Sequence, residues 1–233
     1  MADDTTPPRK AKRSYGYAPM SAEAWETRIT YLRQALAKIK DPSTPEPDPA
    51  LLAVGPHGPL TGMRVAPAPN NGPVSIYFTV QNSERGPRWS PPEVFLMLDL
   101  LLAFGGGASV NDAGNGWAYL RPWGGNDRHT LGRLVANPRP GQVVKQCKRS
   151  DHHDQHPQHF QATGGEGYDP AALGTPRRDR EDAIATALGY WDRNHHRRPD
   201  IRVTRAEYEA VLRDCFRLVD AYYSEDPADA DEA

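Results

Sequence analysis

The sequence predicts an α+β fold in which an antiparallel sheet packs on a central buried helix, with amphipathic helices towards both ends. Three observations support this class. Residues 94–104 are apolar at every position except Asp99, so this helix has no wide polar face and must be covered on most sides. Residues 74–80 are rich in β-branched and aromatic side chains, which is typical of a strand. The segments after the helix resemble hairpins, and a strand, a helix and then hairpins favour an α+β arrangement.

The central helix carries local features that predict where it begins and ends. Ser90 is a favourable N-cap, because its hydroxyl can accept a hydrogen bond from an unpaired amide of the first turn, and Glu93 completes a capping box. Prolines 91 and 92 occupy early positions at which a missing N–H does little harm. Glycines 105–107 predict the end of the helix.

Asp99 is the one charged residue between Val94 and Phe104. A buried carboxylate is costly unless it is paired, so we expect Asp99 either to face the one wet edge of the helix or to pair with an arginine such as Arg121 or Arg133. An unpaired Asp99 would have a raised pKa suited to acid–base chemistry, but a structural ion pair is the simpler interpretation.

Amphipathic helices are predicted on both sides of this core. One begins at Ser21 and ends near Lys40. Its apolar face is formed by Trp25, Ile29, Leu32, Leu36 and Ile39, which recur at helical spacing. A second helix begins at Asp179, and a last helix follows the capping box of Thr204 and Glu207.

Two hairpins are expected between these helices. Residues 108–110 and 117–120 can pair around the Asn115-Gly116 turn. Residues 131–136 and 142–147 resemble a second hairpin around a turn rich in proline and glycine. Residues 150–178 show no convincing periodicity.

The domain organisation follows from composition. Residues 1–20 are polar and carry a basic cluster, so we predict a disordered basic arm. A single α+β domain is predicted at 21–223, including a proline-rich connector at 41–73 and a C-terminal helical pair at 179–223. Residues 224–233 are predicted to be an acidic disordered tail.

Charge is distributed unevenly along a chain whose net charge is −2. Residues 121–205 carry fifteen Lys/Arg against ten Asp/Glu and seven of the eight histidines, so this region is expected to meet any anionic partner. The N-terminus lacks an apolar leader, the longest apolar run is too short to span a bilayer, and the two cysteines form no framework pattern. We therefore expect a cytoplasmic protein with no membrane partner.

The most unusual composition lies at residues 151–159. Imidazoles and carboxylates are ligands of transition metals. The candidate ligands for a divalent transition metal are His152, His153, Asp154, His156 and His159. Strict ligand spacing is absent, and a polar surface loop explains the same composition.

A second candidate site lies between the last two helices. Guanidinium groups bind anions in a bidentate manner, and partly charged histidines add to such a surface. The candidate anion-binding residues are Arg193, His195, His196, Arg197, Arg198, Arg202 and Arg205.

None of these motifs identifies a family, and no nucleophile has an adjacent base signature. The leading interpretation is a non-catalytic binding protein, acting as a regulator, an inhibitor or an accessory subunit. It would dock a nucleic acid or an acidic protein surface through residues 121–205, and it needs no cofactor. The alternative is a metal-dependent hydrolase or nuclease that uses the 151–159 cluster, and a purely structural subunit is a third possibility.

Overall fold

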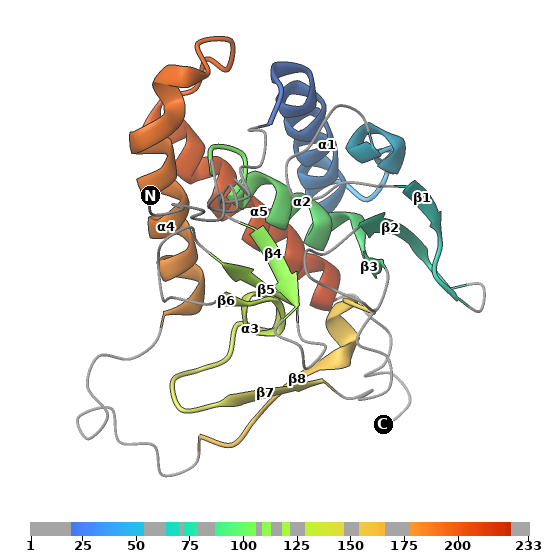
Figure 1. Cartoon of the computed structure of the whole chain (residues 1–233). Coiled ribbons are helices and arrows are strands. Elements are labelled where there is room, and N and C mark those ends of the chain that lie inside the picture. Colours follow the sequence, from blue (N-terminus) through green and yellow to red (C-terminus); the bar gives the residue numbers. More distant parts are fainter. Residues whose placement is uncertain are drawn as a thin grey trace, which may run out of the picture.

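The computed structural model describes residues 20–53, 64–69, 72–78, 87–105, 109–112, 118–121, 129–146, 154–165 and 178–224 (Figure 1). Helices and small antiparallel sheets make up this part of the chain, which confirms the predicted α+β class. The described α-helices are α1 (Ala22–Lys40), α2 (Pro92–Leu101), α3 (Leu131–Ala136), α4 (Asp179–Asn194) and α5 (Arg205–Ser224). Short 3-10 helices are η1 (Pro49–Ala53), η3 (Pro157–His159) and η4 (His195–Arg197).

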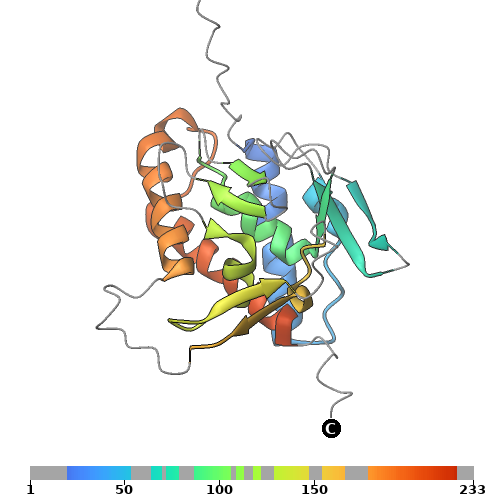
Figure 2. The ribbon, with the colours of Figure 1, turned by 60° about the horizontal axis from the view of Figure 1, so that its bottom comes forward.

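The described strands are divided among three small antiparallel sheets. The first contains β1 (Arg64–Pro67), β2 (Val74–Phe78) and β3 (Arg88–Ser90), and the second contains β4 (Ser109–Asp112), β5 (Ala118–Arg121) and β6 (His129–Thr130). The third consists of β7 (Val143–Gln146) and β8 (Phe160–Thr163), which lie side by side in Figure 2. The predicted strand is confirmed at β2, and the first predicted hairpin is confirmed by the pairing of β4 with β5.

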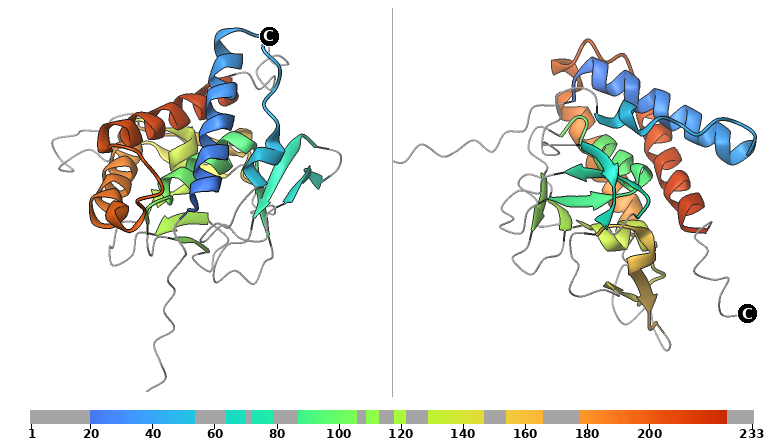
Figure 3. Two further views of the ribbon diagram at one scale, coloured as in Figure 1. Left: turned by 90° about the horizontal axis from the view of Figure 1, so that it is seen from above. Right: turned by 90° about the vertical axis from the view of Figure 1, so that its right-hand side faces the viewer.

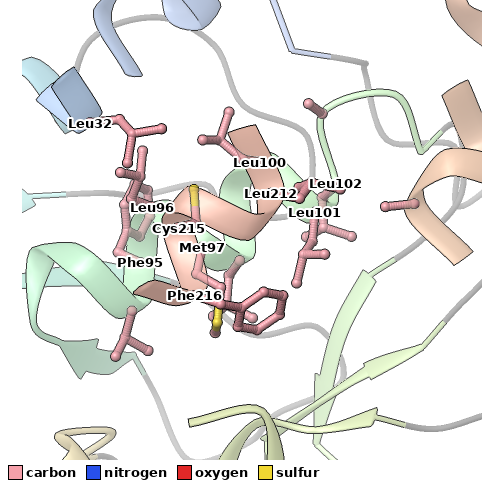
Figure 4. Close-up of a cluster of buried hydrophobic side chains, with 14 of the residues drawn as sticks. Leu32, Phe95, Leu96, Met97, Leu100, Leu101, Leu102, Leu212, Cys215 and Phe216 are labelled. Atoms are coloured by element: carbon pink, nitrogen blue, oxygen red, sulfur yellow. The ribbon is translucent and has the colours of Figure 1, made fainter. Parts of the chain in front are cut away.

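The central helix α2 is buried along its whole length, as its apolar sequence predicts. Helices α1 and α5 cover one side of it, and β2 and β3 pack on another side (Figure 3). Side chains of α1, α2 and α5 form one cluster that includes Leu32, Leu96 and Leu212 (Figure 4). The hydroxyl of Tyr208 on α5 donates a hydrogen bond to the Leu100 carbonyl at 2.6 Å, which fixes α5 against α2.

The predicted capping box at the start of α2 is wrong. The helix begins at Pro92, and Pro91 is the N-cap without a side-chain hydrogen bond. Ser90 instead belongs to β3, where it pairs with Ile76. Since Pro92 has a fixed φ and no N–H, it provides a helix start that needs no hydroxyl cap. Glu93 is thereby left to interact with another helix.

Asp99 has the structural role that was expected but a different partner. Its carboxylate pairs with Arg28 on α1 at 2.9 Å. Arg133 pairs with Asp179 instead, also at 2.9 Å, and the side chain of Arg121 lies outside the described part of the structure. The sequence suggested arginines that follow the helix, whereas Arg28 precedes Asp99 by 71 residues.

The second predicted hairpin is wrong. Residues 131–136 form helix α3, and Asn137 ends it in the left-handed conformation with a φ of 43°. Gly132 allows this helix to lie against Phe160, because a Cβ at residue 132 would sit 2.7 Å from the Phe160 ring. β7 pairs with β8, which lies in the region that showed no periodicity.

The remaining predictions concern the two ends of the chain, the proline-rich connector and the absence of a membrane span. Residues 1–19 of the basic arm and 225–233 of the acidic tail lie outside the described residues. The 41–73 segment contains η1 and β1, and β1 joins the first sheet. Of the described helices, none is both long enough and apolar enough to cross a membrane.

Candidate functional site

The predicted anion-binding residues lie at one corner of the molecule, where α4 turns into α5 (upper left of Figure 1). We call residues 192–205 the α4–α5 corner. Arg193 lies in the last turn of α4, residues 195–197 form η4, and Arg205 begins α5. The residues 192–207 contain five arginines and three carboxylates, which gives a local net charge of +2 with neutral histidines.

Local packing fixes the position of this corner. The buried side chains of Ala183, Ala187 and Leu188 hold α4 against the core. Ile201, in the segment between η4 and α5, is only 7% exposed, so this segment packs against the hydrophobic core. Thr204 and Glu207 form the predicted capping box: the Glu207 carboxylate accepts from the Thr204 amide at 2.7 Å, and the Thr204 hydroxyl accepts from the Glu207 amide at 3.3 Å. The cationic groups are therefore presented by a fixed scaffold.

Two of the arginines are already engaged with carboxylates of the same corner. Arg198 forms a two-point interaction with Asp200, with donor–acceptor distances of 3.0 and 2.6 Å. Hydrogen bonds from Arg198 hold the pKa of the Asp200 carboxyl below its usual value. Arg205 donates to Asp192 at 3.1 Å. These two arginines consequently offer less charge to an outside partner.

Two more of the predicted anion-binding residues, His195 and Arg193, rest on aromatic rings of α4. The His195 ring stacks on Trp191 with centroids 4.0 Å apart and planes inclined by 6°. Its Nδ1 lies 2.9 Å from the Trp191 carbonyl oxygen and donates to it, because a carbonyl can only accept. The Arg193 guanidinium lies 4.8 Å from the centroid of the Tyr190 ring. Stacking orders both groups, and it leaves the positive charge of Arg193 unneutralised.

The remaining three residues are the ones available to a partner. His196, Arg197 and Arg202 are exposed, and none of them forms an ion pair with a described residue. Together with Arg193 they make the free part of the predicted surface. The structure thus brings the predicted residues to one corner but assigns them unequal roles.

The described members of the His/Asp cluster form a hydrogen-bonded group, which we call the Asp154 clasp. Nδ1 of His156 lies 2.6 Å from one Asp154 oxygen, and Nε2 of His159 lies 2.9 Å from the other. The His156 amide donates to Asp154 as well, at 3.0 Å. Burial alone would raise the pKa of Asp154, but the hydrogen bonds from both histidines outweigh it and hold that pKa far below its usual value.

This arrangement differs from a metal site. Ligand atoms must point their lone pairs at one shared ion, whereas these two imidazoles direct ring N–H groups at the carboxylate. Within the described ranges, no group of three or more histidine, cysteine or acidic side chains is arranged to hold a metal ion. His152 and His153, the other two predicted ligands, lie outside the described residues.

The clasp also includes a serine that sequence reasoning did not single out. The Ser75 hydroxyl lies 3.3 Å from Nε2 of His156, so serine, histidine and aspartate are connected in the order found in hydrolytic triads. However, Ser75 is fully buried, and its single hydroxyl proton is directed at the Pro73 carbonyl, at an oxygen–oxygen distance of 3.0 Å. A nucleophile must be reachable by substrate, so this connection acts as a structural tie.

The clasp joins separate parts of the fold. The Gln155 amide donates to the Trp89 carbonyl on β3 at 2.8 Å, and the Gln146 side chain on β7 donates to the Asp154 carbonyl at 3.1 Å. Ser75 adds a contact from β2. Residues 154–159 thus tie the first sheet to the third.

Comparisons with known proteins identified no relative of this chain. A scan against models of protein families found no match, and searches of curated proteins and of solved structures found none either.

Proposed function

We propose that this protein is a non-catalytic binding protein that docks an anionic partner, either a nucleic acid or an acidic protein surface. The contact is the α4–α5 corner within the His/Arg-rich region 121–205. The observation that carries the proposal is the exposure of Arg193, His196, Arg197 and Arg202 at one corner, without carboxylate partners among the described residues. Such a protein serves as a regulator, an inhibitor or an accessory subunit.

The chemistry of these groups suits anions that present several oxygens. A guanidinium group can give two parallel N–H donors to one phosphate or carboxylate. Because the groups are exposed, each contact is weak by itself, so the interaction depends on several groups acting together. Solvent ions screen such contacts over about 8 Å at physiological ionic strength, and binding should therefore weaken as salt rises.

The decisive experiment is purification of the tagged chain from its native host, followed by identification of all bound protein, nucleic acid and metal. The test variant is Arg197→Glu with Arg202→Glu. A matched control is Arg217→Glu, since Arg217 is 65% exposed on α5 and pairs with Asp214 of the same helix. The reversed corner should lose its anionic partner, and the control should retain it. Equal recovery of every partner by both variants would contradict the proposal.

The metal-dependent hydrolase or nuclease stays a prediction with less support. It would use His152, His153, Asp154, His156 and His159. In this structure ring nitrogens of His156 and His159 engage the Asp154 carboxylate. Metal analysis of the same purified sample tests it directly. A stoichiometric transition metal that is lost in the Asp154→Ala variant would favour a metal centre over the clasp.

A further inference from the structure

A small pocket lies between α1, α5 and the beginning of α2. Its volume is about 230 Å³. The walls are mainly apolar, and the lining residues are Ala35, Lys38, Ile39, Glu46, Pro47, Glu93, Leu218, Ala221 and Tyr222. Tyr222 and Arg205 are 17 residues apart on α5, which corresponds to about 25 Å along a helix, so the pocket is distinct from the α4–α5 corner.

Glu93 is the unusual member of this lining. The Tyr31 hydroxyl donates to one of its carboxylate oxygens, Oε1, at 3.1 Å. The other oxygen, Oε2, is buried and has no hydrogen-bond partner among the described residues. Buried polar atoms are almost always hydrogen-bonded, and an exception points to an absent water, ion or ligand. Among the described residues, Tyr31 is thus the side chain that donates to the Glu93 carboxyl, and it reaches one of the two oxygens.

The other charged groups of the pocket do not complete it. The Lys38 ammonium lies 3.0 Å from Glu46 and also donates to the Pro42 carbonyl at 2.8 Å. Both of these groups are nearer to solvent, since the side chains of Lys38 and Glu46 are 30% and 77% exposed. The pocket thus contains two carboxylates and one committed ammonium. Burial raises the pKa of Glu93, and Glu46 acts in the same direction.

We propose that this pocket binds a primary alkylammonium group, with its alkyl chain against the apolar walls and its nitrogen directed at the Glu93 carboxylate. Ala35, Leu218 and Ala221 provide walls that suit methylene groups. An ammonium has three donors, so it can bond the carboxylate and still reach a second acceptor. An anionic ligand would be repelled by Glu46 and by the ionised form of Glu93. A neutral ligand would not offset the desolvation that raises the pKa of Glu93, whereas an ammonium group would.

The size of the pocket limits the ligand. Sites for drug-sized molecules usually occupy about 300–1,000 Å³, so a pocket of about 230 Å³ fits a short aliphatic amine. The same chemistry is offered by a lysine side chain. A free amine and a lysine side chain therefore represent two sources of one ligand group, and the test must separate them.

The test is a titration followed by backbone amide chemical shifts, with n-butylammonium, 1-butanol and sodium butyrate as probes of matched length. We expect saturable shifts with n-butylammonium around Glu93 and Ala221, and binding at least about tenfold weaker for the other two probes. Nα-acetyl-lysine methylamide is the fourth probe, and the tighter of the two amines identifies the source. Equal binding of the alcohol and the amine, or no saturation by either amine, would overturn the proposal.

Variants locate the binding. Glu93→Gln keeps the shape of the side chain and should weaken n-butylammonium by about tenfold or more, since it removes the charge. Ala221→Leu should block the pocket while leaving Glu93 in place. Glu26→Gln is the matched control, because Glu26 is exposed on α1 twelve residues before Lys38. Unchanged affinity in Glu93→Gln, with its unfolding transition intact, would also overturn the proposal.

Discussion

Arg28 on α1 and Asp99 on α2 form an ion pair at 2.9 Å that is almost completely removed from solvent, with side-chain exposures of 0% and 4%. Arg28 also donates to the Leu51 carbonyl at 2.9 Å, and its guanidinium lies 5.9 Å from the Phe95 ring centroid. The burial that isolates this pair lowers the pKa of Arg28, although Asp99 opposes that effect. One interaction therefore connects α1, η1 and the central helix.

Removing one partner of this pair should be strongly destabilising. Asp99→Ala leaves the Arg28 charge buried and uncompensated, so the free energy of unfolding should fall by about 3–5 kcal/mol. Urea denaturation measures this change. The double variant Arg28→Met with Asp99→Leu should recover most of the loss, because apolar residues of similar volume avoid the desolvation cost. A loss below about 1 kcal/mol in Asp99→Ala would show that the cavity and its surroundings accommodate the arginine.

The elements that sequence predicted well are those specified by local pattern. The apolar run of α2, the beginning of α1 at Ser21 and the capping box at Thr204 depend on residues within one or two turns. The strand prediction for residues 131–136 was wrong, because a short apolar segment is compatible with either a strand or a helix. The helix packs through Gly132 against Phe160, which lies 28 residues later and could not be identified from the local pattern.

The candidate sites divide in the same way. The cationic residues of the α4–α5 corner are close in sequence, so their clustering could be predicted from composition. The pairing of Arg205 with Asp192 could not be predicted, because it depends on how the chain turns between α4 and α5. The Asp154 clasp includes Ser75, which is 81 residues from His156. The pocket at Glu93 is built by several separate segments. Within the local sequence, Glu93 was the one lining residue that drew attention, and its position suggested a helix cap rather than a pocket.

The raised pKa of Glu93 predicts how stability changes with pH. Its folded pKa lies above the unfolded value of about 4.5, so the folded state binds the proton more tightly. The free energy of unfolding should therefore decrease as pH rises from about 4.5 through the folded pKa of Glu93. Glu93→Gln should remove this part of the slope, which denaturant titrations between about pH 4.5 and 8 would measure. The Glu26→Gln control should retain the wild-type slope, and a Glu93→Gln slope equal to it would contradict this assignment.

The Asp154 clasp predicts the opposite dependence. Its histidine hydrogen bonds depress the pKa of Asp154, so the stabilisation is complete above the unfolded value of about 3.8 and is lost as pH falls below it. Asp154→Ala should cost about 1–3 kcal/mol for each histidine donor that stays buried without an acceptor. Unfolding at pH 7 measures the cost, and repeating it down to about pH 2 should show a shallower acid slope than wild type. An acid slope that does not change would mean that other carboxyl groups control it.

Two glycines within helices provide a matched test of the packing between α3 and β8. A Cβ added to Gly132 would lie 2.7 and 2.9 Å from two carbons of the Phe160 ring, so Gly132→Ala should destabilise by about 1–3 kcal/mol. At Gly189 on α4 the nearest atom is a terminal nitrogen of Arg193 at 3.7 Å, which leaves room for a methyl group. Gly189→Ala should therefore stabilise by up to about 1 kcal/mol through helix propensity. Thermal unfolding compares both, and Phe160→Leu should reduce the penalty at residue 132, since a smaller side chain gives the new methyl space. If Gly132→Ala were as favourable as Gly189→Ala, the close approach of α3 to Phe160 would be refuted.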